Sequence, residues 1–241
     1  MIVLVAAGAA AAPGLTIELD PDETHHLRVR RADGDVRVDV RDGRGLVAKG
    51  TLRFAGRRTV VEVDIAERVA PPPPLRLAVG AGDRDRFAWM VEKATELGVT
   101  DIVPLETERA MTVASRLRAA GVTRLERRAL EAVKQCGAAW APAIHAPLPL
   151  ATFLSDAPGG ARWLADAEGA ATPRVDGTVT VIVGPEGGLT DAERAAARAA
   201  GYRPVRLGAE TLRFETAALA VAAHIAAVRV GGVSPGGVPH G

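Results

Sequence analysis

The amino-acid sequence predicts an α/β protein in which a small β domain precedes a larger domain with a mostly parallel sheet. Short segments of alternating apolar and polar residues fill the first 70 residues, and apolar segments alternate with helix-period segments after residue 75. Four consecutive prolines at 71–74 separate the two patterns, and such a run forms a stiff, extended connector. The predicted domains are therefore 1–70 and 75–231, followed by a disordered tail at 232–241.

Composition and charge restrict the function only weakly. The chain has 30 Lys+Arg and 29 Asp+Glu, a formal net charge of +1, so no global field marks a nucleic-acid binder. The single Cys136 cannot form an internal disulfide, and neither it nor the five scattered histidines match a metal or redox spacing. The apolar N-terminus lacks a basic segment and is too short to span a bilayer, so we expect a cytoplasmic protein.

The first domain is expected to be a small β-barrel or sandwich. Alternating segments at 35–40, 45–54 and 59–65 are separated by turn sequences rich in Gly and Asp. The one helical candidate of this domain is "DPDETHHLRVR", in which Asp20 or Asp22 can cap the first turn.

The second domain begins with βα units. The segments 75–80, 101–105, 143–146 and 161–166 are expected strands, and a short helix is expected near 150–156. Phe87, Met90, Val91 and Ala94 share one helix face, and Gly98 is a natural stop for that helix.

A second amphipathic helix is expected from about residue 123 to 136. Its apolar face carries Leu125, Ala129, Ala132, Val133 and Cys136, and its other face carries Arg124, Arg127, Arg128 and Lys134. The basic face has two interpretations, a solvated helix surface or a contact with RNA.

The stretch "VIVGPEGGLTDAE" joins a buried strand at 178–183 to a helix that ends near Gly201. Residues 184–188 form what we call the glycine loop, whose glycines allow positive φ and leave backbone donors and acceptors open to a ligand. Thr190 and Glu193 have the spacing of a capping box. Because the loop matches neither the Walker A nor the G-x-G-x-x-G pattern, it is on its own also consistent with a simple tight turn.

A similar unit follows, with a strand at 203–208, a second loop at 209–215 and an apolar helix from Thr216 to about Arg229. Loops after neighbouring parallel strands meet at one edge of a sheet. The two units together therefore predict a pocket for a small cofactor.

The pair "GPEGGLTDAE" and "LGAETLRFETAALA" closely resembles the C-terminal motifs of the ribosomal RNA small subunit methyltransferase E family. "HHLRVRRADGD", "VEKATELGVTDIVPLETER" and "EAVKQCG" follow that family in the same order, so the similarity extends over nearly the whole chain. This resemblance implies a SPOUT α/β domain with a deep trefoil knot, a PUA-like N-terminal β-barrel that binds RNA, and a homodimer. It also implies methylation of N3 of a uridine in 16S rRNA of the small ribosomal subunit, with S-adenosyl-L-methionine as cofactor.

The resemblance implies roles for particular residues of this chain. Cofactor binding is expected at Leu164, Val183, Gly184, Glu186, Gly188, Leu207, Gly208 and Leu212. Glu186 has a second interpretation, in which it bonds the N–H groups of its own loop. RNA binding is expected at Arg28, Arg30, Arg31 and Arg109. The arginines of the first domain are interleaved with Asp33, Asp35 and Asp39, so a solvated surface is the alternative interpretation.

Two residues are candidates for the chemistry. Arg213 matches the family's arginine beside the cofactor, where its paired donors suit a uracil carbonyl edge or a phosphate. Its alternative role is a salt bridge to Glu215 or to a partner subunit. Glu215 is the nearest candidate base, or alternatively a charge in the first turn of the following helix.

Three departures from the family remove basic residues. The chain has Ala138, Ala139 and Trp140 after "QCG", and Ala81-Gly82-Asp83 where the family commonly has Lys-Gly-Asp. Its opening "MIVLVAAGAA" has no arginine and no aromatic residue. The alternative functions are therefore a SPOUT methyltransferase with another RNA target, or a binding module that is a non-catalytic RNA-binding dimer or holds phosphate at a helix N-terminus.

Overall fold

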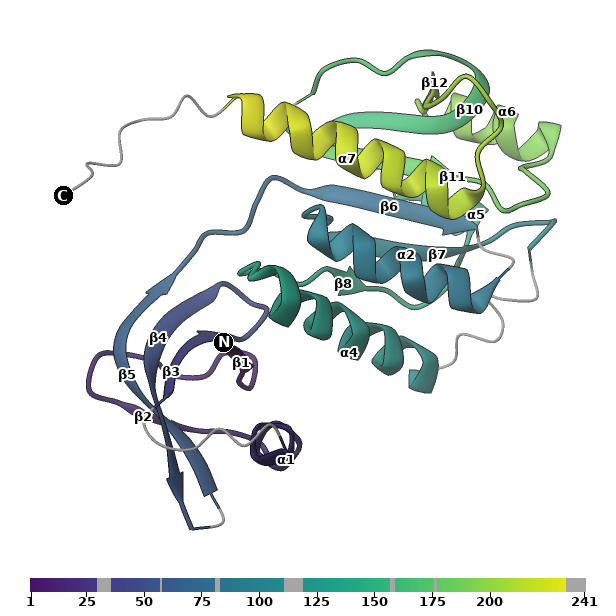
Figure 1. Cartoon of the computed structure of the whole chain (residues 1–241). Helices are drawn as coiled ribbons and strands as arrows, with labels where there is room; N and C mark the ends of the chain where they lie inside the picture. Colours follow the sequence, from purple (N-terminus) through teal and green to yellow (C-terminus); the bar gives the residue numbers. More distant parts are fainter. Residues whose placement is uncertain are drawn as a thin grey trace. The chain divides into compact units, whose positions relative to one another are not determined.

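The computed structural model describes residues 1–29, 36–56, 58–80, 83–110, 119–156, 159–175 and 177–232, apart from the side chains of His26, Arg28, Val29 and Ala119. The described chain divides into two compact units (Figure 1). Unit 1 comprises Met1–Pro72 and Ala129–Ala141, and unit 2 comprises Pro73–Arg128 and Pro142–Gly241. The predicted tail lies outside the described residues from residue 233 onward.

Unit 1 is built on a five-stranded sheet with the order β1-β3-β4-β5-β2. Its elements are β1 (Ile2–Leu4), β2 (Thr16–Glu18), α1 (Pro21–Val29), β3 (Val36–Arg41), β4 (Leu46–Ala55) and β5 (Arg58–Arg68). The predicted helix and the three long strands are confirmed, and Asp20 Oδ1 caps α1 by accepting from the Glu23 amide at 2.7 Å. β1 and β2 stand at opposite edges, so the strand pairing alone does not close a barrel.

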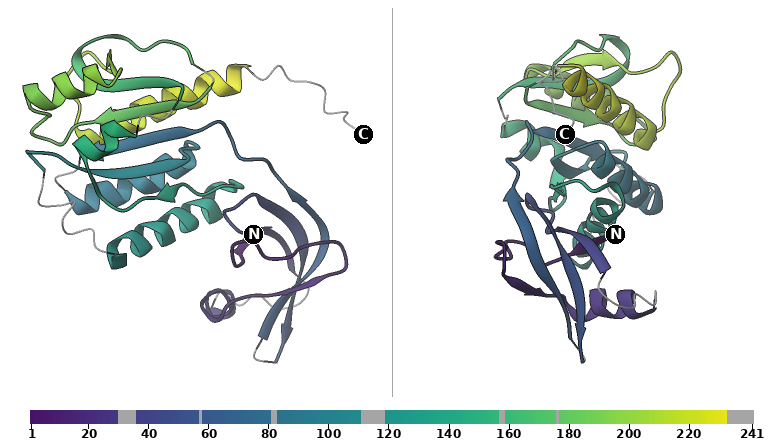
Figure 2. Two further views of the ribbon diagram at one scale, coloured as in Figure 1. Left: turned by 180° about the vertical axis from the view of Figure 1, so that it is seen from behind. Right: turned by 60° about the vertical axis from the view of Figure 1, so that its left-hand side comes forward.

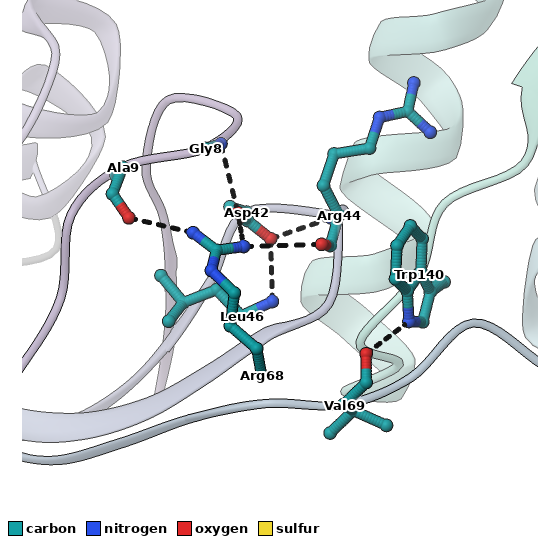
Figure 3. A network of polar contacts seen from close by, with 8 residues as sticks. All are labelled: Gly8, Ala9, Asp42, Arg44, Leu46, Arg68, Val69 and Trp140. Atoms are coloured by element: carbon teal, nitrogen blue, oxygen red, sulfur yellow. Dashed lines mark hydrogen bonds and ion pairs between the residues drawn. The ribbon is translucent and has the colours of Figure 1, made fainter.

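A buried carboxylate organises the turn between β3 and β4. The Asp42 side chain is fully buried and accepts hydrogen bonds from the amides of Gly8, Arg44 and Leu46 and from Arg68 Nη1 (Figure 3). Burial alone would raise the pKa of Asp42, but these hydrogen bonds to the charged form outweigh it, and the pKa is lowered. The turn is therefore held by an ionised aspartate.

The segment Ala129–Ala141 completes unit 1 although it is far away in sequence. Trp140 Nε1 donates to the Val69 carbonyl at 3.1 Å, as Figure 3 shows, and the Gly45 amide donates to the Ala139 carbonyl at 2.8 Å. Ala139 and Trp140 thus hold this segment against the strands of unit 1.

Unit 2 contains a seven-stranded sheet with parallel pairing throughout. The strands follow the order β12-β10-β11-β6-β7-β8, and β9 also pairs with β7. The strands are β6 (Leu75–Gly80), β7 (Asp101–Glu106), β8 (Ala143–Ile144), β9 (Leu148–Pro149), β10 (Ala161–Ala171), β11 (Val179–Val183) and β12 (Arg203–Arg206). The helices are α2 (Arg84–Glu96), α4 (Ala119–Cys136), α5 (Leu150–Ser155), α6 (Asp191–Ala199) and α7 (Phe214–Gly232); α4 passes into unit 1 at Ala129. This confirms the predicted α/β class.

Helices cover both faces of this sheet. Figure 1 shows α2 beside α7 on one face, and the reverse view in Figure 2 brings α5 and α6 forward. Leu164 packs in a core cluster with Phe153 and Tyr202, whereas the neighbouring Trp163 contacts His224 of α7. Successive side chains of a strand point to opposite faces of the sheet, which explains why the neighbours Leu164 and Trp163 have different contacts. Within the described residues, no helix is both long and apolar enough to cross a membrane.

Candidate functional site

A cavity of about 300 Å³ opens where β11 and β12 end. This volume is at the lower end of the range for small-molecule sites, about 300–1,000 Å³. All the residues expected to bind the cofactor line it, namely Leu164, Val183, Gly184, Glu186, Gly188, Leu207, Gly208 and Leu212. The topology thus brings three distant segments of the sequence to one place.

The strand β10 contributes a break in its pairing. Its register with β12 shifts between Ala165 and Ala170, so the intervening residues bulge out of the ladder. Ala165, Asp166 and Ala167 line the cavity from this bulge.

The glycine loop is a tight turn with little room for side chains. The Gly188 amide donates to the Pro185 carbonyl at 2.7 Å, and Gly188 has φ of +69°. A Cβ on Gly184 would lie 3.2 Å from the Leu189 nitrogen. The loop therefore presents backbone to the cavity, which fits close approach by a ligand.

The predicted capping box is present at the end of this loop. Thr190 Oγ1 accepts from the Glu193 amide at 3.2 Å, and Glu193 Oε2 accepts from the Thr190 amide at 2.8 Å. These bonds satisfy donors at the start of α6 and fix where the loop leaves the cavity.

The remaining lining mixes apolar groups with charges. Phe214 and Ala217 of α7 contribute apolar surface, and the charged members are Asp166, Glu186, Glu210, Arg194 and Arg206. Apolar walls suit an adenine ring, while carboxylates and backbone groups can bond hydroxyl and amino groups. The residues present therefore fit an adenosine-containing cofactor.

Sequence reasoning missed Asp166. Its side chain is only 12% exposed; Oδ1 accepts from the Glu168 amide at 3.0 Å, and Oδ2 lies 3.5 Å from Arg198 Nη2. A carboxylate directly after the apolar run of a parallel strand was the available signal, but the bulge that turns it toward the cavity leaves no pattern in the sequence.

Arg213 lies between two cavity-lining residues, Leu212 and Phe214, without lining the cavity itself. Its side chain is exposed and has no hydrogen-bond or ion-pair partner among the described residues. The guanidinium is therefore available to a substrate next to the cofactor cavity.

Glu215 does not line the cavity. Its Oε1 accepts from Arg86 Nη1 of α2 at 3.1 Å, and the residue is buried. The considered pair between Arg213 and Glu215 is thus replaced by one between Arg86 and Glu215. The geometry places Glu215 in the contact between α2 and α7.

The start of α2 is capped by Asp83. Asp83 Oδ1 accepts from the amides of Asp85 and Arg86, each at 2.9 Å. The hydrogen bond from the Arg86 amide is the main cause of the lowered pKa of Asp83. Asp83 thus fixes the helix that carries the partner of Glu215.

The residues expected to bind RNA divide into two groups. Arg30, Arg31 and the side chain of Arg28 lie outside the described residues. Arg109 is described, and its Nη1 donates to the Gly187 carbonyl at 2.6 Å. This arginine contacts the glycine loop itself.

The basic face of α4 is partly neutralised. Arg128 pairs with Glu92 at 2.7 Å, and Lys134 pairs with the buried Glu23 at 2.6 Å. These pairs favour the structural interpretation of that face. In the described parts of the chain, no three His, Cys, Asp or Glu side chains are grouped so that they could hold a metal ion.

Comparison with known proteins identifies relatives over most of the chain. Residues 70–226 match the RNA methyltransferase domain family. A ribosomal RNA small subunit methyltransferase E from Synechocystis sp. is 30% identical over 217 residues, which cover 84% of this chain and 70% of that protein.

Solved structures agree with this match. The ribosomal RNA small subunit methyltransferase E from Neisseria gonorrhoeae, bound to S-adenosyl methionine, has a TM-score of 0.80 and 25% identity, over 92% of this chain and 94% of that one. A putative methyltransferase from Legionella pneumophila, in complex with the same cofactor, has a TM-score of 0.81 and 25% identity, over 94% of this chain and 98% of that one.

Proposed function

Because the chain belongs to the ribosomal RNA small subunit methyltransferase E family, we propose that it methylates N3 of a uridine in 16S rRNA of the small ribosomal subunit, with S-adenosyl-L-methionine as methyl donor. The observation that carries the proposal is that one cavity is lined by every residue expected to bind the cofactor, and that Arg213, whose side chain has no partner among the described residues, lies beside it.

The cofactor is assigned to the cavity through residues of this chain. Leu164, Val183 and Leu212 would enclose the purine, and the backbone of the glycine loop would bond its polar edge. When bound, the cofactor supplies a methyl group that is already activated by a sulfonium centre. The chain therefore has to orient the uridine and stabilise charge, and it needs no covalent step of its own.

Arg213 is assigned to the developing charge. As N3 of the uracil loses its proton to water, negative charge spreads to O2 and O4, and a guanidinium offers paired donors to that edge. Glu215 is assigned a positioning role, because its ion pair with Arg86 fixes the first turn of α7 next to Arg213.

The finer features of the fold belong to the same proposal. The sheet of unit 2 would carry the SPOUT trefoil knot, and unit 1 would be the PUA-like RNA-binding domain. Arg28, Arg30 and Arg31 would contact RNA there, and a homodimer would be the working form. The parallel order of the sheet and the location of both loops at one edge support the assignment of unit 2.

The test is methyl transfer to small ribosomal subunits that lack the modification, followed by nucleoside analysis of the 16S rRNA. We expect 3-methyluridine at one site, formed only when S-adenosyl-L-methionine is present. Methylation of another nucleoside would indicate a different RNA target. Cofactor binding without any methyl transfer would indicate a non-catalytic RNA-binding protein.

A further inference from the structure

The segment that follows β7 lies along the glycine loop. The Glu108 amide donates to Glu193 Oε1 at 2.8 Å, and Arg109 Nη1 donates to the Gly187 carbonyl at 2.6 Å. The Ala110 amide closes a turn onto the Thr107 carbonyl at 3.0 Å. The short segment 107–110 therefore bonds both the loop and the helix that follows it.

Arg109 fixes one peptide group of the loop from outside the cavity. The Gly187 carbonyl accepts from Arg109, while the N–H of the same peptide, on Gly188, donates to Pro185. A peptide held at both ends cannot rotate without breaking both hydrogen bonds. Neither Arg109 nor Gly187 lines the cavity, whereas Glu186 and Gly188 on either side of Gly187 do.

The stem of Arg109 also packs on the loop. Its Cδ lies 3.4 Å, and its Cβ 3.5 Å, from the position that a Cβ on Gly187 would take. These are ordinary van der Waals distances, so the aliphatic part of the side chain covers Gly187 while its end holds the carbonyl.

Glu193 anchors both partners of this contact. This carboxylate is only 9% exposed, and its two oxygens accept from the amides of Thr190 and Glu108. The end of the glycine loop and the segment that carries Arg109 are thus fixed to the same side chain, which sets the distance from which Arg109 reaches Gly187.

We propose that Arg109 is a positioning residue for the cofactor cavity, which holds the Gly187–Gly188 peptide in the orientation that presents Glu186 and Gly188 to the cofactor. The inference rests on the proposed function only in taking S-adenosyl-L-methionine as the ligand. It gives Arg109 a role different from the RNA contact that the sequence predicts.

The test compares Arg109→Met with the unaltered protein. Methionine keeps an aliphatic stem over Gly187 and removes the donor, so loss of one hydrogen bond is expected to raise the Kd for S-adenosyl-L-methionine by about two- to tenfold without RNA. In the cofactor-free protein, the Gly188 amide should exchange with deuterium faster by a similar factor. Arg109→Lys, which keeps a donor, should recover part of both effects, and Arg124→Met on the exposed face of α4 is the matched control.

The outcomes separate the alternatives. An unchanged Kd and an unchanged Gly188 exchange rate in Arg109→Met would overturn the proposal, and a loss of RNA affinity alone would make Arg109 an RNA contact. A thermal midpoint lowered by more than about 4 °C would point to general destabilisation instead. If the unaltered protein does not bind the cofactor, the proposed function fails, whereas the exchange rate of Gly188 still decides whether Arg109 fixes the loop.

Discussion

Arg213 is an exposed arginine between two residues that line the cofactor cavity, and its side chain has no partner among the described residues. Arg213→Ala should therefore leave the fold intact and remove a donor that acts on charge formed during methyl transfer. Such a donor typically contributes about 2.7–4 kcal/mol, or on the order of 10²–10³ in rate. Single-turnover methylation of small subunits should slow by about that factor, while cofactor affinity changes by less than about tenfold.

Two further variants make the Arg213 prediction specific. Arg213→Lys should not restore full activity, because an ammonium group lacks the paired donors. Arg203→Ala removes another exposed arginine, at the start of β12, and should leave the rate unchanged. If cofactor affinity falls as much as the rate does, Arg213 belongs to the cofactor pocket and not to the chemistry.

Gly188 tests whether the glycine loop is a binding site or only a turn. Its φ of +69° is unfavourable for a branched side chain, and Gly188→Val should abolish binding of S-adenosyl-L-methionine in calorimetry. Gly98→Val is the matched control, since Gly98 has φ of +73° and open space around it after α2. Both variants carry similar backbone strain. Normal cofactor binding by Gly188→Val would therefore show that the glycine loop is only a turn and not a binding site.

Asp42 gives a prediction for stability and pH. Asp42→Asn weakens the bonds from three amides and Arg68 and should lower the free energy of unfolding by about 2 kcal/mol at pH 7. Because the folded-state pKa is lowered, this stability is present above the unfolded-state pKa of about 3.9 and is lost as the pH falls through the folded-state value. The two proteins should therefore converge in urea unfolding at acid pH.

An exposed pair provides the comparison for Asp42. Asp64 pairs with Arg37 at 2.7 Å, and both side chains are largely exposed. Asp64→Asn should change stability by less than about 1 kcal/mol at any pH. An effect as large as that of Asp42→Asn would show that charge alone, without burial and backbone bonds, explains the result.

Individual residues also show what the sequence can and cannot predict. Six of the eight cofactor positions could be assigned because they stand in two short motifs, Val183 directly precedes the first motif, and Leu164 belongs to an upstream strand; all eight line one cavity. The Arg86–Glu215 pair joins residues 129 positions apart, and no local pattern identifies it. The sequence predicts an RNA contact for Arg109, and its contact with Gly187 depends on how the loops meet in space.

Among the elements, α1 and α4 are joined by a nearly buried ion pair. Lys134 Nζ donates to both oxygens of Glu23, at 2.6 and 2.7 Å, and their side chains are 19% and 6% exposed. Lys134→Met alone leaves a buried carboxylate unpaired and should destabilise unit 1 by about 3 kcal/mol. Hydrogen exchange in α1 should increase, since this helix loses its ionic contact with α4.

The double variant Lys134→Met/Glu23→Leu decides how that pair acts. Replacing both charges by apolar groups removes the unpaired carboxylate, so most of the lost stability should return. If the double variant is as unstable as the single one, the Lys134–Glu23 pair stabilises unit 1 through its own hydrogen bonds, and not by compensating a buried charge.

Long elements were predictable from their pattern, and among the short ones β8 and α5 were also expected, whereas β1, β2 and β9 were not. The apolar faces of α2 and α4 are long enough to show a helical period, and β11 is a continuous buried run of five residues. β1, β2 and β9 have at most three residues and carry no measurable alternation. Their pairing comes from the folded neighbours, because backbone groups there need partners whatever the side chains are.

For the whole molecule, the proline run marked the change of unit, but the return of Ala129–Ala141 to unit 1 was not predicted. The helix pattern of α4 is continuous through Arg128 and Ala129, so its sequence shows no boundary. Contacts such as that of Trp140 with Val69 decide the assignment, and they become visible only in three dimensions.

The proposed homodimer has a candidate surface on α7. This helix is apolar along most of its length, yet Thr216, Ala223, Ala227 and Val230 are exposed, Val230 to 76%. A helix that is apolar on all sides is normally covered on all sides. We therefore expect a dimer at micromolar concentration in light scattering, and a monomer for Ala223→Glu/Ala227→Glu, because the added charges would be buried without partners at the interface.

The exposed alanines of α6 supply the control for this last prediction. Ala195→Glu/Ala196→Glu adds the same charge to another exposed helix face and should leave the dimer intact. A dimer that survives the α7 substitutions would place the interface elsewhere, and a monomeric unaltered protein would remove the dimer from the proposal. If the partner subunit takes part in RNA binding, the α7 variant should lose methyl transfer together with the dimer. Its affinity for S-adenosyl-L-methionine is measured in parallel. Loss of the partner alone is expected to change that affinity by less than about tenfold.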